Sequence, residues 1–190
     1  MVAVAFLLLC TSADAAIRYE VSLAHPEMHL FHVSMEVPDV NGEVNLQMAA
    51  WNALYEIRDF SSHVQRVQAF ANGQAAPIEK LDKLTWHVQG RGTVTVKYDT
   101  FWDDVGPFNS QLNAEHAFIN PAMILLYVAN RRDETCSLNL DDAPPGWKAV
   151  SAILGARIVS LAASGHSLFE AASFDALADA QFVRQSLRLN

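Results

Sequence analysis

The chain has 190 residues, of which 51% are apolar and 18% are charged. This composition fits one domain with a substantial core and excludes an intrinsically disordered protein. The chain carries 21 acidic and 13 basic side chains, for a formal net charge of −8. Its longest cationic run is Arg131-Arg132, whereas phosphate binding needs several convergent Lys or Arg side chains. The excess of acidic side chains and the lack of a basic cluster therefore argue against a nucleic-acid partner and against attachment to an anionic membrane surface.

Residues 1–16 are predicted to be a signal peptide. Val2–Leu9 is an unbroken apolar run that is too short to span a bilayer, and Ala13-Asp14-Ala15 supplies the small-x-small pattern of a cleavage site. No Lys or Arg precedes the run, so a start further upstream and a buried first strand remain alternatives. The bulky Leu9 argues against lipidation of Cys10. We expect a secreted or periplasmic protein without membrane attachment once the leader is removed.

After the leader, apolar residues recur mainly with a period of two, which is typical of half-buried strands. Turn-forming residues separate the alternating segments at Pro38–Gly42, Ala71–Gln74, Gln89–Gly92 and Asp141–Gly146, and the second contains the Asn-Gly pair of tight hairpins. The pattern predicts an all-β fold, a β-sandwich of mostly antiparallel strands over residues 17–182. The expected strands are Ile17–Leu23, His29–Met35, Val44–Met48, Leu84–Val88, Thr93–Tyr98, Thr135–Leu140 and one that begins at Trp147.

Four segments depart from this alternation. Phe108–Asn120 is polar and irregular and is predicted to be a long loop, whereas Ala122–Val128 is continuously apolar and is predicted to be a strand buried on both faces. Ser173–Asp179 is predicted to be a short helical turn capped by Ser173. Gln181–Asn190 shows no clear core pattern, so residues 183–190 are predicted to be a tail or the start of a further domain.

Two groups of residues could suggest zinc. His25, His29 and His32 lie close in sequence, but on a strand His25 and His29 share one face and His32 points to the other. Their spacing matches no standard zinc signature, so polar-face histidines are the preferred interpretation. Glu115-His116 has no second histidine four residues away, where a helical ligand pair would need one. We expect no metal site in this chain.

Cysteine and tryptophan offer other kinds of site. Cys136 is the one cysteine outside the leader, so it cannot form an internal disulfide in the mature chain, and we interpret it as a structural residue rather than a nucleophile. The chain contains no Gly-x-Ser-x-Gly nucleophile elbow. Tryptophan side chains could stack on sugars; Trp86 is predicted to lie in the core and Trp102 to be partly exposed, and the remaining tryptophans are Trp51 and Trp147.

Six short motifs occur in a fixed order along the chain. They are Trp51 and Tyr55 ahead of Ile57-Arg58-Asp59-Phe60, then His63-Val64, Lys80-Leu81-Asp82-Lys83-Leu84-Thr85-Trp86, Val94-Thr95-Val96-Lys97-Tyr98, Pro144-Pro145-Gly146-Trp147 and Phe174-Asp175-Ala176-Leu177-Ala178-Asp179. With these motifs in this order, the chain resembles the amino-terminal domain of the glycyl aminopeptidase family of zinc metallopeptidases. It departs from the family pattern at Asn52-Ala53, where Pro-Gly is usual, and at Ala180-Gln181, where Ser-Pro is usual.

The resemblance implies a β-sandwich that packs on a catalytic domain in cis and walls its cleft, with peptide termini as further partners. The His-Glu-x-x-His zinc motif of the family is not in this sequence, so no catalytic residue, metal ligand or cofactor is carried over. Zinc is expected only in the catalytic domain, and this chain alone is expected not to be an enzyme. The motif residues Trp51, Tyr55, Arg58, Asp59, Asp82, Trp86 and Trp147 are expected to have structural roles, and Arg58-Asp59 could brace a turn.

The surface expected to face the catalytic domain is the loop Gly106–Pro121. It is long and polar, and it carries Asn109, Gln111, Asn113, Glu115 and His116. Two alternatives belong to other classes of protein. One is a stand-alone secreted β-sandwich that binds a peptide or a glycan. The other is an independent enzyme, although no group of residues in the sequence indicates a catalytic site.

Overall fold

The computed structural model describes residues 16–50, 58–104, 106, 109–152, 156–161 and 167–186, which form two β-sheets. The predicted signal peptide, except Ala16, lies outside these residues, as do Trp51 and Tyr55. The first sheet contains β1 (Ile17–Ser22), β2 (Leu30–Met48), β3 (Val64–Ala71), β4 (Gln74–Ala76), β5 (Ile78–Lys80), β6 (Thr85–Phe101), β9 (Leu126–Val128), β10 (Cys136–Asp141), β12 (Ala156–Leu161) and β13 (Ser167–Ala171). The second contains β7 (Gln111–Leu112), β8 (His116–Ile119), β11 (Trp147–Ala152) and β14 (Gln181–Ser186).

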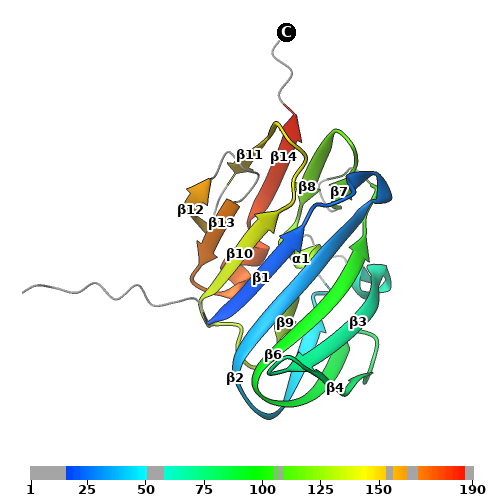
Figure 1. Cartoon of the computed structure of the whole chain (residues 1–190), viewed down its shortest axis with the longest axis vertical. Coiled ribbons are helices and arrows are strands. Elements are labelled where there is room, and N and C mark those ends of the chain that lie inside the picture. Colours follow the sequence, from blue (N-terminus) through cyan, green and yellow to red (C-terminus); the bar gives the residue numbers. More distant parts are fainter. Residues whose placement is uncertain are drawn as a thin grey trace, which may run out of the picture.

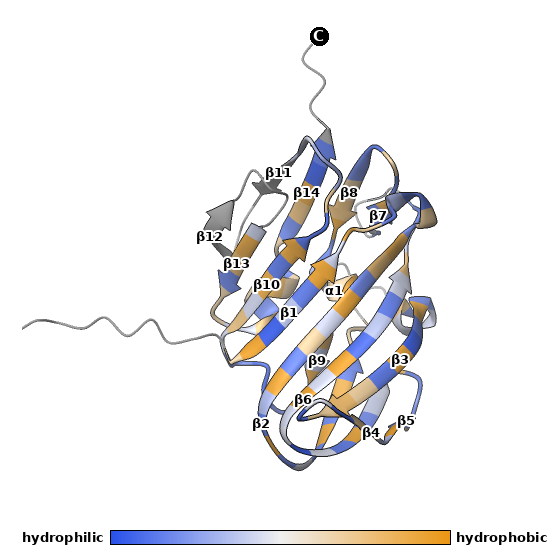
Figure 2. Ribbon diagram, in the orientation of Figure 1, coloured by the Kyte–Doolittle hydropathy of each residue, from blue (hydrophilic) through white to orange (hydrophobic). Residues whose placement is uncertain are grey.

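The strands run in the order β12-β13-β10-β1-β2-β6-β3-β4 in the first sheet and β11-β14-β8-β7 in the second. All described pairs are antiparallel except β1 with β10. Figure 1 looks onto the first sheet, where β1, β2, β6 and β3 lie side by side. Hydrophobic and hydrophilic residues alternate along β1 and β2 (Figure 2), so one face is buried and the other is outward. The predicted all-β sandwich is confirmed.

Within the described ranges, four short helical segments interrupt the strands: η1 (Pro26–Met28), η2 (Phe60–His63), α1 (Pro121–Ile124) and α2 (Phe174–Ala178). The last is the predicted C-terminal helical turn. Its cap is also as predicted, because the Ala176 N–H donates to the Ser173 hydroxyl at 3.1 Å.

The two longest strands, β2 and β6, pair from Leu30–Phe101 to Gln47–Thr85, with a register shift between Val37 and Val40. The predicted turns at Pro38–Gly42 and Gln89–Gly92 are therefore wrong, because both segments lie inside paired strands. The same residue types that form turns also form bulges, which bend a strand and increase its twist without ending it. By contrast, the predicted Asn72-Gly73 hairpin is confirmed, since both residues have positive φ and Ala71 pairs with Gln74.

The apolar segment Ala122–Val128 is buried, as predicted, apart from the half-buried Tyr127, but it is not one strand. Its first residues continue α1, which begins at Pro121, and the chain extends again only from Leu126. Proline favours the first helical position because its φ is already helical and its missing N–H has no partner there. Helical and extended buried segments share the same unbroken apolar pattern, which explains the incorrect prediction.

The core lies between the sheets and includes three tryptophans. Trp86 is buried as predicted, whereas Trp102, predicted to be partly exposed, is only 3% exposed. Its indole N–H donates to the Thr100 hydroxyl at 2.9 Å, and the His63 ring stacks on it at 3.8 Å between centroids. Trp147 is buried as well, so none of the tryptophans in the described part of the chain offers a sugar-stacking platform.

Two further predictions concern Cys136 and the C-terminal residues. Cys136 is buried in β10, and burial raises the pKa of its thiol to about 12, so it is a structural residue as predicted. Gln181–Ser186 was predicted to lack a core pattern, but it forms β14 in the middle of the second sheet, with Phe182 and Arg184 buried. This strand extends beyond residue 182, the predicted end of the domain.

Candidate functional site

The predicted loop Gly106–Pro121 contains a small hairpin. Gln111 pairs with Phe118 and Leu112 with Ala117, so the prediction that Phe108–Asn120 is irregular is wrong for β7 and β8. Leu112, Ala117 and Ile119 are buried against the core, whereas Gln111 and His116 are only half-buried. Strands of two and four residues are too short for an alternating pattern to stand out from a polar background.

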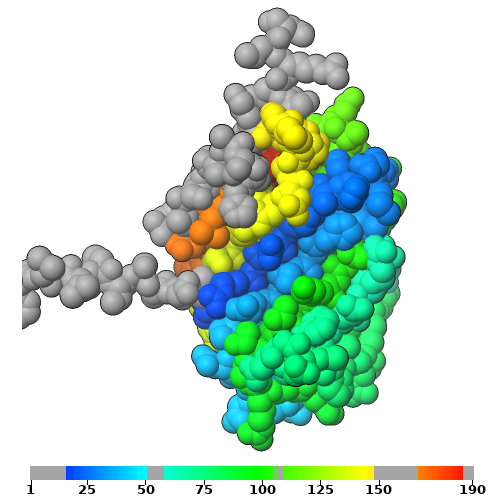
Figure 3. Space-filling view, viewed as in Figure 1, coloured from blue at the N-terminus to red at the C-terminus, as the bar shows by residue number. Residues whose placement is uncertain are grey.

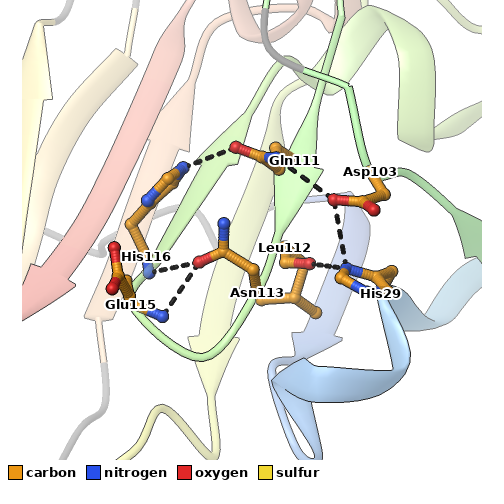
Figure 4. Close-up of polar contacts among 7 residues, drawn as sticks. All are labelled: His29, Asp103, Gln111, Leu112, Asn113, Glu115 and His116. Atoms are coloured by element: carbon orange, nitrogen blue, oxygen red, sulfur yellow. Dashed lines mark hydrogen bonds and ion pairs between the residues drawn. The ribbon is translucent and has the colours of Figure 1, made fainter.

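Asn113 fixes the turn of this hairpin. Its side-chain oxygen accepts hydrogen bonds from the backbone N–H groups of Glu115 and His116, both at 2.9 Å (Figure 4). Asparagine forms such local bonds readily, which is why it favours turns. Asn113 thereby sets the direction of the exposed Glu115 side chain and of the His116 ring.

Gln111 connects the two strands of the hairpin to the end of β6. Its amide oxygen accepts from His116 Nε2 at 2.8 Å, and its amide nitrogen donates to Asp103 Oδ1 at 3.1 Å (Figure 4). Gln111 and Asp103 also form a backbone bridge. On the segment that leads into the hairpin, the Asn109 amide donates to Asp104 Oδ2 at 2.6 Å. Four of the five predicted residues are therefore held by side-chain hydrogen bonds, and Glu115 is held by its backbone.

His29, between η1 and β2, joins this network from the amino-terminal part of the chain. Its Nδ1–H donates to the Leu112 carbonyl at 2.6 Å and lies 3.3 Å from Asp103 Oδ1 (Figure 4). Sequence patterns did not indicate that His29 and Asp103 would lie beside the hairpin. The exposed apolar side chains of Met28, in η1, and Phe101, whose ring centroid is 5.9 Å from that of His29, adjoin the same region. We call this surface the hairpin patch; it comprises Met28, His29, Phe101, Asp103, Gln111 and His116.

The three histidines considered for zinc do not act together. His25 and His29 flank η1 with positive φ rather than lying on a strand, so the expectation that they share a strand face is wrong. His29 binds the Leu112 carbonyl, whereas His32 Nδ1 donates to Asp99 on β6 at 2.5 Å. Across the described residues, no three His, Cys, Asp or Glu side chains are grouped as ligands for a metal ion.

Four of the family-motif residues, Arg58, Asp59, Asp82 and Trp86, lie near the start of β6, whereas Trp147 begins β11 in the second sheet. The Asp59 carboxylate lies 2.9 Å from Lys83 Nζ and accepts from the Ser61 hydroxyl, contacts that lower its pKa. Asp82 accepts from the backbone N–H groups of Leu84 and Thr85, and the first of these bonds is the main cause of its lowered pKa.

The other motif residues near this point are Trp86 and Arg58. The Lys80 ammonium lies 4.4 Å from the ring centroid of Trp86. The Arg58 backbone N–H donates to the Ala50 carbonyl at 2.8 Å. These contacts join residues near the start of β6, and the structural role expected of Asp59, Asp82 and Trp86 stays a prediction.

No helix within the described ranges is both long enough and apolar enough to cross a bilayer. None of the curated proteins matches the chain. Among solved structures, an aminopeptidase N family protein of Idiomarina loihiensis superposes with a TM-score of 0.82 and 29% identity. That match covers 92% of this chain and 30% of the Idiomarina protein.

Weaker matches are two structures of an M1 zinc metallopeptidase of Deinococcus radiodurans, one of a variant bound to a Tyr-Ser-Ala substrate. Their identities are 11% and 13% and their TM-scores 0.48 and 0.46, with 90% of this chain and 42% of the other chain covered. The family model described as the Peptidase M61 N-terminal domain matches residues 18–181, which is most of the chain. The predicted resemblance is confirmed, and the chain belongs to the Peptidase M61 N-terminal domain family.

Proposed function

We propose that this chain is the non-catalytic amino-terminal domain of a secreted, glycyl-aminopeptidase-like zinc metallopeptidase, and that it packs on a catalytic domain and forms one wall of its cleft. The supporting observation is the match to the Idiomarina protein, which covers 92% of this chain but only 30% of that protein. The counterpart of this fold is therefore one part of a longer protein. Zinc belongs to the proposed catalytic domain, and the residues of this chain contribute binding surface.

The hairpin patch is the proposed contact surface. It combines exposed apolar side chains, Met28 at 51% and Phe101 at 44%, with polar groups already held in place by hydrogen bonds. Fixed polar groups around apolar anchors are typical of protein interfaces, because little side-chain entropy is lost on binding. The exposed carboxylate of Glu115 adds a group that can bind the ammonium of a peptide amino terminus.

The reading frame after codon 190 provides the first test. We expect it to continue in frame and to encode His-Glu-x-x-His with a later glutamate, the ligands and general base of a zinc peptidase. The chain alone, assayed with peptide substrates and added zinc, should show no hydrolysis. A genuine stop at codon 190 would favour a stand-alone binding module instead, and zinc-dependent hydrolysis by this chain would contradict the proposal.

The contact surface can be tested in the full-length enzyme. We expect the Glu115→Ala/His116→Ala double variant to lower kcat/KM, because it removes the His116 ring from the hairpin patch and the exposed Glu115 carboxylate beside it. The matched control is Glu79→Ala/Gln89→Ala, which changes two exposed side chains on β5 and β6, away from the hairpin. Unchanged kinetics in the first variant, or equal losses in both, would count against this surface.

The proposed secretion can be tested separately. The intact mass of protein collected outside the cytoplasm should correspond to a chain that lacks the leader, residues 1–16. A mass that retains residues 1–15 would rule out the predicted signal peptide without affecting the contact with a catalytic domain.

A further inference from the structure

The outward face of the first sheet contains a polar groove of about 420 Å³. Figure 3 shows this face as adjacent bands formed by β1, β2, β6 and β3. The groove is distinct from the hairpin patch, since the two share no residue. Six of its side chains matter for what it can bind: Glu20, His32, Ser34, Arg66, Lys97 and Asp99.

Strand register places these side chains in two neighbouring rows. Ser34 on β2 pairs with Glu20 on β1 and with Lys97 on β6, so one row runs from an acid through a hydroxyl to a base. In the next row, His32 pairs with Asp99. Because residues two apart on a strand point to the same side, all five side chains lie on the outward face.

Asp99 is the fixed centre of the groove, with only 14% of its side chain exposed. It accepts a hydrogen bond from His32 Nδ1 at 2.5 Å and another from Arg66 Nε. Arg66 reaches it from a bulge, since Gln65 pairs with Asp99 and Gln68 with Lys97, which leaves Arg66 and Val67 opposite a single residue. Arg66 has a φ of 55°, a conformation that is costly for a residue other than glycine and that concentrates at functional sites.

This arrangement leaves cationic groups available to a ligand. Arg66 bonds Asp99 through Nε, and no hydrogen bond of its terminal nitrogens occurs among the described residues. The Lys97 ammonium forms no ion pair there either; it lies 6.0 Å from the Phe70 ring centroid. The Ser34 hydroxyl lies in the row between Lys97 and Glu20. Two cations beside a hydroxyl are the donors that bind an oxyanion.

We propose that this groove binds a small monocarboxylate ligand, with the carboxylate held by the Arg66 guanidinium and the Lys97 ammonium. Asp99 and Glu20 place two negative charges around the groove, which disfavours dianions such as phosphate. Glu20, on the opposite side of Ser34 from Lys97, favours a ligand whose remainder is neutral or cationic. The proposal stands independently of the contact with a catalytic domain.

The test is a titration of the isotope-labelled chain, followed by amide chemical shifts, with N-acetylglycylglycine, its carboxyl-terminal amide and inorganic phosphate. We expect saturable shifts with the free acid at His32–Ser34, Arg66–Gln68 and Lys97–Asp99. We expect none with the amide, and no competition by phosphate. Both Arg66→Gln and Lys97→Gln should weaken binding about tenfold, as for the loss of one charge-assisted hydrogen bond.

Arg91→Gln is the matched control, because Arg91 is an exposed cation on the same strand as Lys97 but away from the groove, and it should bind normally. Lys97→Gln leaves the Asp99 contacts in place, and the spectra themselves report whether each variant is folded. Shifts that do not saturate, or equal shifts with the amide, would overturn the proposal. Full binding by both groove variants would overturn it too, and preferential binding of phosphate would overturn the monocarboxylate class.

Discussion

Two buried tyrosine hydroxyls, those of Tyr19 and Tyr98, support the joint between α1 and β9. The Tyr19 hydroxyl donates to the Leu126 carbonyl at 2.9 Å. The Tyr98 hydroxyl donates to the Ile124 carbonyl and accepts from the Leu126 N–H, both at 2.9 Å. Burial raises the pKa of both phenols, so they remain neutral hydrogen-bonding groups. The backbone groups where the helix ends are thereby satisfied inside the core.

Tyr98→Phe tests this support. The change keeps the ring but leaves a buried carbonyl and a buried N–H without their partner, which should lower the free energy of unfolding by about 1–3 kcal/mol. Urea unfolding measures the change. Tyr127→Phe is the control, because the half-buried Tyr127 hydroxyl donates to a side chain, that of Gln47, and its loss should cost less. Equal effects of the two substitutions would show that the joint does not depend on Tyr98.

Asp59 should make the stability of the folded chain depend on pH. The Lys83 contact and the Ser61 hydroxyl lower its pKa in the folded chain, so its contribution to stability is present above the unfolded pKa, about 4. It is lost as the pH falls through the lowered folded value. Asp59→Asn should therefore destabilise the chain at neutral pH, by less than about 1 kcal/mol because the pair is exposed.

The difference between wild type and Asp59→Asn should disappear in acid. Unfolding midpoints measured across the acid range provide the check. Glu79→Gln, which removes an exposed carboxylate on β5, is the matched control. A difference for Asp59→Asn that persists unchanged at low pH would mean that the effect is not electrostatic.

Local sequence patterns predicted the strands well. They did not predict which segments between the predicted strands form turns and which form bulges inside a longer strand. Asn72-Gly73 encodes its hairpin locally, because both turn residues tolerate positive φ. The residues at Pro38–Gly42 carry equally strong turn chemistry, yet the pairing of β2 with β6 continues past them. Whether such residues make a turn or a bulge is decided by the partner strand, which no local pattern contains.

The candidate site shows the same limit. The polar run from Asn109 to His116 predicted a common surface, and the structure joins most of its side chains in one network. His29 was not predicted to join it, because it bonds Leu112 across a separation of 83 residues. Contacts of that length follow from the topology of the sheets, which spacing along the chain does not reveal.

Two glycines with the same φ of +80°, Gly73 and Gly92, allow a test of the contact between the β3–β4 hairpin and β6. A Cβ at Gly73 would meet nothing within 4 Å, whereas one at Gly92 would lie 2.5 Å from Asn72 Oδ1. Asn72 donates to the Arg91 carbonyl and accepts from the Thr93 N–H, so moving it breaks both bonds. Gly73→Ala should cost about 1–2 kcal/mol from backbone strain alone, and Gly92→Ala about 1 kcal/mol more.

A double-mutant cycle isolates that extra cost. In an Asn72→Gly background the obstructing side chain is gone, so Gly92→Ala should cost no more than Gly73→Ala does in the wild type. Chemical unfolding of the four proteins gives the coupling free energy. Additive effects of Asn72→Gly and Gly92→Ala would show that Asn72 does not hold the hairpin tip against β6.

At the scale of the whole molecule, the C-terminal strand joins the two sheets into one core. β14 lies between β11 and β8 in the second sheet, and its Phe182 ring packs edge-on against Phe169 of the first sheet, at 4.6 Å between centroids. The buried Arg184 donates to the Ser167 hydroxyl of β13 at 2.5 Å, so it too connects the sheets. The second sheet therefore depends on residues at the edge of the matched family region, which ends at residue 181.

Truncation tests this dependence. A chain that ends at Ala180 lacks β14, an inner strand of the second sheet, and loses the Phe182 ring, whose removal alone should cost about 3–5 kcal/mol. Because a domain of this kind is stable by only about 5–15 kcal/mol, that chain should show no cooperative thermal transition. A chain that ends at Ser186 keeps all of β14 and should unfold at the wild-type midpoint. If both unfolded alike, β14 would be an appendage to the sandwich, and the domain would end where the sequence pattern placed it, at residue 182.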